Sequence, residues 1–171
     1  MKTPIIFLST LLLAPLVAIS APAVSKSEPK PNIIIILADD LGPGDMSCAG
    51  ATKIKTPNLD RLAGEGVRFK QGYAPSATCT PSRYSMLTGE YAWRQKAKVN
   101  TILDGDAPLC IEPGRLTLPA LLRQDGYHTA VIGKWHLGLG FRKDAKGQWD
   151  WSQPLDHSPV DLGFDRSLII P

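Results

Sequence analysis

Apolar and polar positions along the chain alternate between continuous apolar runs and segments with helical spacing. Ile33 to Ala38 is an unbroken, largely β-branched apolar run, bounded by Asn32 and Asp39. Such a run predicts a strand that is buried on both faces of a parallel sheet. Tyr127 to Ile132 has the pattern of a second strand, and Ser167 to Pro171 has the pattern of the opening of another.

Helix signals lie between these predicted strands. Thr56 is expected to cap a helix whose first residue is Pro57, and Gly64 and Gly66 are expected to end it. Thr117 is expected to cap another helix, which ends at Gly126. This alternation predicts an α/β fold with a doubly wound, mainly parallel sheet. In such sheets, ligands bind beyond the carboxyl ends of the strands.

The first residues have the pattern of a secretory signal, with a basic start, a mostly apolar run from Ile5 to Ile19 and small residues after it. An uncleaved membrane anchor is disfavoured, because this run is shorter than the roughly 20 residues that a spanning helix needs and contains Pro15. We therefore divide the chain into a signal peptide (1–23), a flexible leader (24–31) and a globular domain (32–171). The protein is expected to be exported, to the periplasm or extracellular space, or to a lysosome-type compartment in a eukaryote.

The composition is that of a globular domain. Of the 171 residues, 43% are hydrophobic and 20% are charged, which is enough for a domain with a core. The formal net charge of +3 is too small to indicate a nucleic-acid partner.

The segment Cys79-Thr80-Pro81-Ser82-Arg83 places a Cys, a Pro and an Arg at C-x-P-x-R spacing. A single Cys is most often a small buried residue, but hydroxyl side chains surround this one, as in an exposed turn. Pro81 suits the first turn of a helix that continues through Leu87. Cys79 would then lie at a helix N-terminus, where partial positive charge favours an oxyanion. Arg83 would lie one turn above it.

Charged residues follow the first two predicted strands. Asp39 and Asp40 come directly after the first strand, and Lys134 and His136 come after the second. An arbitrary Asp-Asp pair is most often a solvated turn. At the end of a buried strand, however, two carboxylates repel each other unless a hard cation such as calcium or magnesium lies between them. On an extended segment Lys134 and His136 would point to the same side, where they could bind an anion and handle a proton.

Four segments, in order along the chain, carry a resemblance to a known family: Pro31 to Gly42, Thr56 to Ala63, the C-x-P-x-R segment, and Gly133-Lys134-Trp135-His136-Leu137-Gly138. Together they resemble the type I sulfatases, the formylglycine-dependent, arylsulfatase-like branch of the alkaline phosphatase superfamily. The resemblance implies that a formylglycine-generating enzyme converts Cys79 to formylglycine, the precursor of the nucleophile.

The same resemblance implies roles for the other residues. Asp39, Asp40 and the modified Cys79 would be metal ligands, for Ca²⁺ in preference to Mg²⁺. Arg83, Lys134 and His136 would be catalytic, and Lys134 and His136 would also bind the sulfate of the substrate.

The implied function is that of a sulfuric ester hydrolase acting on a sulfated small molecule or sulfated carbohydrate, with no stable membrane span. Two alternatives stay open: a phosphonate monoester hydrolase or phosphodiesterase of the same superfamily, and a non-catalytic remnant. Sulfatases are several hundred residues long and take further metal ligands from later regions. The chain is therefore expected to be the N-terminal part of a catalytic domain, with an incomplete sheet and doubtful activity alone.

The remaining cysteines, a Pro/Gly-rich segment and a late aspartate carry further expectations. If Cys79 is modified, Cys48 and Cys110 either form a disulfide or stay unpaired thiols. The segment from Gly105 to Gly114 either rims the substrate pocket or is a structured connection. Asp165 is expected in a structural turn rather than at the metal.

Overall fold

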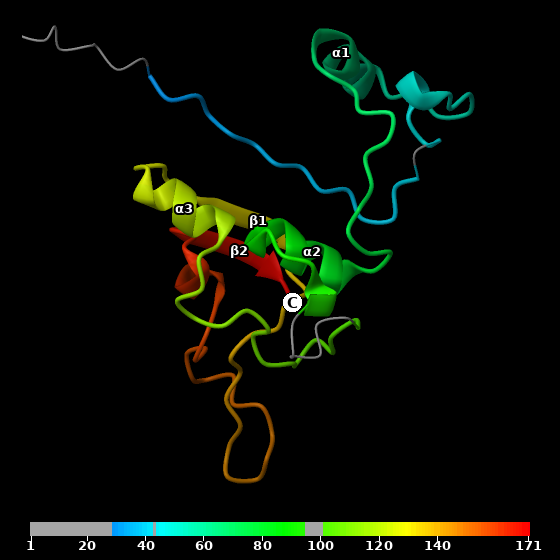
Figure 1. Cartoon of the computed structure of the whole chain (residues 1–171). Coiled ribbons are helices and arrows are strands. Elements are labelled where there is room, and N and C mark those ends of the chain that lie inside the picture. The colour runs from blue at the N-terminus through cyan, green and yellow to red at the C-terminus, as the bar shows by residue number, and fades with distance from the viewer. Residues whose placement is uncertain (1–28, 43, 95–100) are drawn as a thin grey trace, which may run out of the picture. The chain divides into compact units, whose positions relative to one another are not determined.

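The computed structural model describes residues 29–42, 44–94 and 101–171 (Figure 1). The chain divides into two compact units, Met1–Leu37 and Ala38–Pro171. The predicted signal peptide, residues 1–23, lies outside the described residues. Within the described residues, we find no helix with the length and apolar character needed to cross a membrane.

The apolar run from Ile33 to Ala38 does not form the predicted strand. Its side chains are exposed, and those of Ile34 and Ile36 are each 84% exposed. A strand exists through backbone hydrogen bonds to a neighbouring strand, and residues 33–38 belong to no such ladder in this structure. An apolar pattern expresses a preference for burial, but it does not supply the neighbouring strand.

The described residues of the second unit contain a sheet of two parallel strands, β1 (Ala130–Lys134) and β2 (Arg166–Ile170), which lie side by side in Figure 1. Their register runs from Ala130 opposite Arg166 to Lys134 opposite Ile170. β2 confirms the strand predicted at the end of the chain. The predicted α/β class with a parallel sheet is confirmed, and the sheet is incomplete.

Thr129 explains why β1 begins later than the predicted Tyr127. Its backbone N–H donates to the Asp165 carboxylate at 2.8 Å, and its hydroxyl donates to the Gly163 carbonyl at 2.8 Å. These bonds join the residues just before the two strands, so strand pairing starts directly after them. Asp165 is thereby engaged in a structural turn, as expected from the sequence.

The three α-helices are α1 (Pro57–Glu65), α2 (Cys79–Thr88) and α3 (Leu118–Gln124). Short 3-10 helices cover Ser47–Ala49 (η1), Ala92–Arg94 (η2) and Pro159–Leu162 (η3). All three α-helices lie where the sequence predicts helical segments.

The two predicted helix caps differ in outcome. The Thr117 side chain accepts a hydrogen bond from the backbone N–H of Ala120, as expected for the cap of α3. The Thr56 side chain makes no capping bond to α1. Its hydroxyl instead contacts Ser47 at 3.0 Å and donates to Asp60 at 3.2 Å, because two polar side chains close to it compete with the helix N–H groups.

The hydrophobic core of the second unit joins α2 to the sheet and to the segment after β1. Its buried residues include Tyr84 and Leu87 of α2. Val131 and Ile169, from the two strands, pack against this core, while the other face of the sheet exposes its apolar side chains. The remaining buried members are Ala92, Ile111, Trp135, Leu137, Leu139, Leu162 and Phe164.

A core substitution tests this packing. Leu162→Ala, at a side chain that is 1% exposed, is expected to lower the free energy of unfolding by about 2–5 kcal/mol, because it leaves a cavity. Leu168→Ala is the matched control, since that leucine is 73% exposed, and it is expected to change the free energy by less than about 0.5 kcal/mol. Urea unfolding followed by circular dichroism measures both, and equal effects would contradict the assigned core.

Candidate active site

The carboxyl end of β1 places a lysine between two other functional side chains. Lys134 is the last residue of β1, and its Nζ lies 2.5 Å from Asp39 Oδ2 and 3.3 Å from Cys79 Sγ. Cys79 Sγ lies 3.9 Å from Asp39 Oδ1. Three residues that are far apart in the sequence therefore meet beyond the end of a parallel strand, where ligands bind in open α/β sheets.

The N-terminal half of α2 contributes Cys79 and Arg83. Cys79 is the first residue of the ten-residue helix, so the unpaired N–H groups of the helix N-terminus lie beside its side chain. Arg83 follows one turn later, and its side chain is only 11% exposed. One guanidinium nitrogen donates to the Lys134 carbonyl at 2.7 Å, and the other donates to Asp39 Oδ2 at 3.4 Å. Arg83 thus connects α2, β1 and Asp39.

The charges of this cluster stabilise one another. The hydrogen bond from Lys134 lowers the pKa of Asp39, against a smaller effect of desolvation, and the charges of Lys134 and Arg83 add to the lowering. The hydrogen bond to Asp39 raises the pKa of Lys134, and the contact with Cys79 adds to the rise. At neutral pH, Asp39 is therefore a carboxylate and Lys134 an ammonium group.

His136 is held in a separate network. Its ring Nε2 lies 2.8 Å from the Leu103 carbonyl, and its own carbonyl accepts the Thr80 hydroxyl at 2.9 Å. The Thr80 hydroxyl also accepts from the Leu103 N–H at 3.2 Å. Nε2 donates to this carbonyl, because a carbonyl oxygen only accepts, and Nδ1 is buried without a hydrogen-bond partner in the described residues.

The predicted extended geometry from Lys134 to His136 is wrong. β1 ends at Lys134, and His136 adopts a left-handed conformation with φ of 53°. The turn is held by Trp135, whose indole N–H donates to the Gly138 carbonyl at 2.8 Å. Lys134 consequently faces Asp39 and Cys79, while the His136 imidazole faces Leu103.

The predicted metal ligands are only partly brought together. Asp39 and Cys79 are neighbours. At Asp40 the backbone turns into the left-handed region, with φ of 60°, so Asp40 does not continue the extended segment before it. Within the part of the chain that the structure describes, no group of three or more His, Cys, Asp or Glu side chains is arranged to hold a metal ion. The donor chemistry nevertheless fits a hard cation, because Asp39 and Asp40 supply carboxylate oxygens, although Lys134 and Arg83 pair with the Asp39 carboxylate in this structure.

The three cysteines are free thiols, so Cys48 and Cys110 form no disulfide. Burial raises the pKa of Cys110 to about 12, which keeps its thiol protonated at neutral pH. Cys79 is the cysteine that lies among charged functional groups.

The sequence reading missed Thr80 and Leu103. Thr80 is fully buried and holds the backbone of His136 in place. Its position within the C-x-P-x-R segment was visible, but a threonine between Cys and Pro gives no sign of a buried hydroxyl. Leu103 takes part only through its backbone N–H and carbonyl, and the sequence carries no sign of such a role.

Comparisons with known proteins identify the family. Residues 31–168 match the protein family described as Sulfatase. The chain is 51% identical over 143 residues to an N-acetylgalactosamine-6-O-sulfatase of Bacteroides thetaiotaomicron, covering 83% of this chain and 27% of that protein. It is 42% identical over 164 residues to the steryl-sulfatase of Mus musculus, covering 93% of this chain and 25% of that protein.

Solved structures agree with this assignment. A structure described under the metabolism of multiple glycosaminoglycans by Bacteroides thetaiotaomicron superposes with a TM-score of 0.75 at 50% identity, over 83% of this chain and 28% of that one. A crystal structure of Ps i-CgsB superposes with a TM-score of 0.58 at 30% identity, over 84% of this chain and 29% of that one.

The chain belongs to the sulfatase family. It spans about a quarter of the length of the curated relatives that it matches.

The buried hydroxyl of Thr80 is expected to stabilise the fold. Thr80→Val removes the hydroxyl that pairs with the His136 carbonyl and the Leu103 N–H, and should lower the free energy of unfolding by about 1–3 kcal/mol. Thr88→Val is the matched control on the same helix, because the Thr88 hydroxyl donates to a carbonyl of its own helix. This control also loses the bond that the Thr88 hydroxyl accepts from the Glu90 N–H at 3.3 Å, but Thr88 is only half-buried, so the change should cost less than about 1 kcal/mol.

Both Thr variants can be compared with the parent chain by thermal unfolding. The His136 ring should also lose its fixed position in Thr80→Val alone, which the line width of its imidazole NMR signals reports. Unchanged stability and unchanged His136 signals in Thr80→Val would contradict the assigned network.

Proposed function

We propose that this chain forms the N-terminal part of the catalytic domain of an arylsulfatase-like sulfuric ester hydrolase. The observation that carries the proposal is the meeting of Cys79, Lys134 and Asp39 at the N-terminus of α2 and the carboxyl end of β1. This position offers positive charge from a lysine and from a helix N-terminus, which suits an anionic sulfate ester.

Residue 79 is the proposed nucleophile, after conversion of its thiol to formylglycine by a formylglycine-generating enzyme. When hydrated, this group supplies two hydroxyls on one carbon, one to attack the sulfur atom and one to let the sulfate leave. The chain's own groups orient it: α2 fixes the backbone of residue 79, and Lys134 lies within hydrogen-bond distance of its side chain. Arg83 keeps both elements in place through the Lys134 carbonyl and Asp39.

Charge and proton handling fall to Lys134 and His136. The Lys134 ammonium can donate to a sulfate oxygen without leaving the cluster, because its flexible stem reaches from the end of β1. The contacts of Lys134 with Asp39 and Cys79 support its roles in substrate binding and catalysis. For His136, whose ring faces Leu103, the same two roles are proposed from the resemblance of the Gly133–Gly138 segment to the sulfatases.

Asp39, Asp40 and residue 79 are the residues that would hold a calcium ion, with magnesium as the less suitable hard cation. Calcium would offset the Asp39 carboxylate and stabilise negative charge on the sulfate oxygens. The Asp39 carboxylate supports a cation site there, because it attracts positive charge; Lys134 and Arg83 now hold it, and a bound calcium would compete with them for its oxygens.

A sulfated carbohydrate is the proposed substrate class. The relative at 51% identity is an N-acetylgalactosamine-6-O-sulfatase, and the Ps i-CgsB structure was also determined in complex with k-i-k-neocarrahexaose. Steryl-sulfatases are more distant, at 39–43% identity. Export is proposed from the signal pattern in residues 1–23.

Conversion of Cys79 is tested by coexpressing the chain with a formylglycine-generating enzyme. Mass spectrometry should show that the peptide with Cys79 loses roughly 18 mass units, as its thiol is oxidised to an aldehyde. Peptides with Cys48 and Cys110 serve as internal controls and should keep their mass. An unmodified Cys79 in a folded chain would support the non-catalytic alternative instead.

Cation binding is tested by calorimetric titration of the converted chain with calcium. Asp39→Asn should abolish binding, because it removes the carboxylate charge. Lys134→Met should tighten binding by about two- to fivefold, because the ammonium no longer competes for Asp39. Lys143→Met removes a lysine that does not contact Asp39 and should leave the affinity unchanged. Equal affinities in all four proteins would rule out Asp39 as a ligand.

A further inference from the structure

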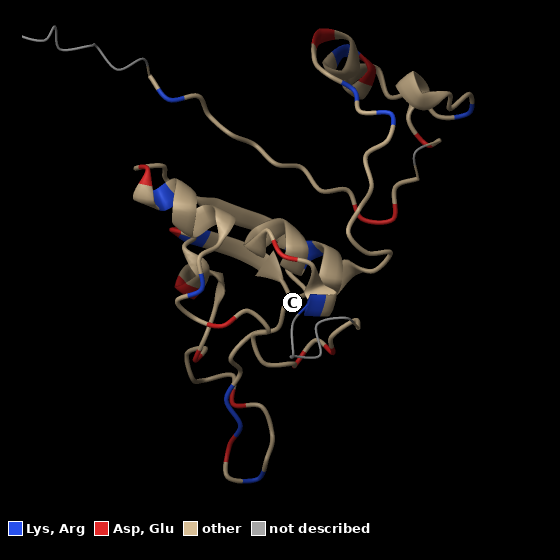
Figure 2. Ribbon diagram, viewed as in Figure 1, with Lys and Arg blue, Asp and Glu red and all other residues tan. Residues whose placement is uncertain are grey.

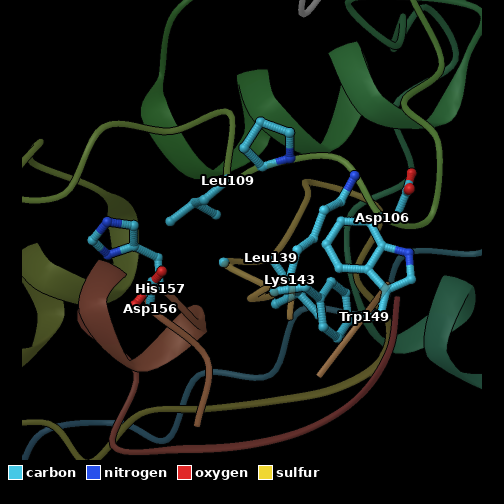
Figure 3. Close-up of a pocket in the computed structure, with 10 residues that line it drawn as sticks. Asp106, Leu109, Leu139, Lys143, Trp149, Asp156 and His157 are labelled. Atoms are coloured by element: carbon cyan, nitrogen blue, oxygen red, sulfur yellow. The ribbon is translucent and has the colours of Figure 1, made fainter. Parts of the chain in front are cut away.

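A cavity of about 460 Å³ lies outside the cluster of Asp39, Cys79 and Lys134, none of which lines it (Figure 3). We call it the loop pocket. It is lined by Asp106, Pro108, Leu109, Leu139, Gly140, Phe141, Lys143, Trp149, Asp156 and His157. Part of the Gly105–Gly114 segment lines this cavity, which does not include Cys79, so its expected place at the rim of the substrate pocket stays a prediction.

Backbone hydrogen bonds fix the walls of the loop pocket. The N–H of Leu139 donates to the Ala107 carbonyl at 2.9 Å, and the N–H of Gly140 donates to the His157 carbonyl at 2.9 Å. A Cβ at Gly140 would lie only 2.3 Å from the His157 nitrogen, so this close approach requires glycine. The loop pocket is therefore built into the fold, as ligand sites usually are.

One side of the loop pocket is aromatic. Trp149 and Phe141 pack edge to face with ring centroids 5.7 Å apart, and the Lys143 ammonium lies 4.4 Å from the centroid of Trp149. Figure 3 shows Lys143 and Trp149 together on one side of the cavity, with Asp156 and His157 on the other. Leu109 and Leu139 lie between them.

The polar groups of the loop pocket carry charges that nearly cancel. Lys143 is opposed by Asp106 and Asp156, and Asp156 also accepts a hydrogen bond from Arg142 Nε at 2.6 Å. Balanced charge does not favour a second sulfate group. Aromatic and apolar walls with carboxylate, imidazole and ammonium groups at the edges suit a neutral sugar ring, whose C–H faces are apolar and whose rim carries hydroxyls.

The loop pocket is joined to the candidate active site by a short buried segment. Lys134 is five residues before Leu139, so their Cα atoms are at most about 18 Å apart. Trp135, Leu137 and Leu139 are nearly fully buried between the two places, which holds them at a fixed separation. An oligosaccharide of a few sugar units reaches across such a distance, whereas a small aryl sulfate does not.

We propose that the loop pocket binds a neutral sugar ring of an oligosaccharide whose sulfated ring is held at Lys134. The inference rests on the proposed function, and it adds a binding site that selects carbohydrate chains over small sulfate esters. Trp149 supplies the contact surface for the neutral sugar ring. Asp156, His157 and Lys143 bind the hydroxyls of that sugar.

The test uses the 171-residue chain labelled with ¹⁵N, and follows the indole N–H signal of Trp149, assigned with Trp149→Phe. Three probes are titrated: 6-O-sulfated N-acetylgalactosamine, a tetrasaccharide that contains this sugar, and the same tetrasaccharide without sulfate. Both tetrasaccharides should shift the Trp149 signal saturably, and the monosaccharide should not. The sulfated tetrasaccharide should bind about tenfold more tightly than the monosaccharide.

Substitutions then locate the gain in affinity. With affinities measured by isothermal titration calorimetry, which needs no signal from Trp149, Trp149→Ala should remove the tenfold difference and leave the monosaccharide affinity unchanged. Trp151→Ala is the matched control, because Trp151 packs on Phe141 at 5.3 Å but does not line the loop pocket, and it should keep the difference. Lys143→Gln, at an exposed position, gives a second variant if Trp149→Ala does not fold.

The possible outcomes separate the two proposals. A Trp149 signal that neither tetrasaccharide moves, or a tenfold difference that survives in Trp149→Ala, would overturn the loop-pocket assignment while leaving the proposed function in place. A desulfated tetrasaccharide that shifts Trp149, together with no binding of the sulfated monosaccharide, would support the loop pocket and contradict sulfate binding at Lys134.

Discussion

The buried guanidinium of Arg83 is the contact on which the geometry of the candidate site depends. An arginine does not lose its charge in a protein, so burial obliges it to find acceptors. Arg83 finds them in the Lys134 carbonyl and the Asp39 carboxylate. These two bonds set the first turn of α2 against the end of β1, and Cys79 takes its position from that turn.

Charge explains why these particular groups meet. Most residues of α2, β1 and β2 are uncharged (Figure 2), and Arg83 is the one charged residue of α2. In the cluster itself, the two cations Lys134 and Arg83 face one carboxylate, Asp39, which leaves an excess of positive charge. An anionic ester is attracted to such a place, and the helix N-terminus at Cys79 adds to the attraction. The carboxylate keeps the two cations from repelling each other before a substrate arrives.

The buried turn from Trp135 to Leu139 connects the end of β1 to the loop pocket. It leaves β1 sharply, packs into the core and is bonded by backbone groups to the Ala107–Cys110 segment. Because this turn is rigid, the end of β1 and the loop pocket are held at a fixed distance. The carbohydrate substrate that we propose would use both places at once, and the fixed distance would then be a basis for its specificity.

The sequence by itself determined the family, the positions of the helices and the identity of the charged residues. Cys79 at the start of a helix followed from Pro81 and the polar residues around it, because proline and helix-end chemistry are local. Lys134 at the end of a strand followed from the apolar run before it. The tertiary structure decided what local patterns do not contain: the burial of Thr80, the backbone role of Leu103 and the turn of His136 away from Lys134. It also decided that Ile33 to Ala38 forms no strand here, because strand pairing and buried hydrogen bonds depend on neighbours that are distant in the chain.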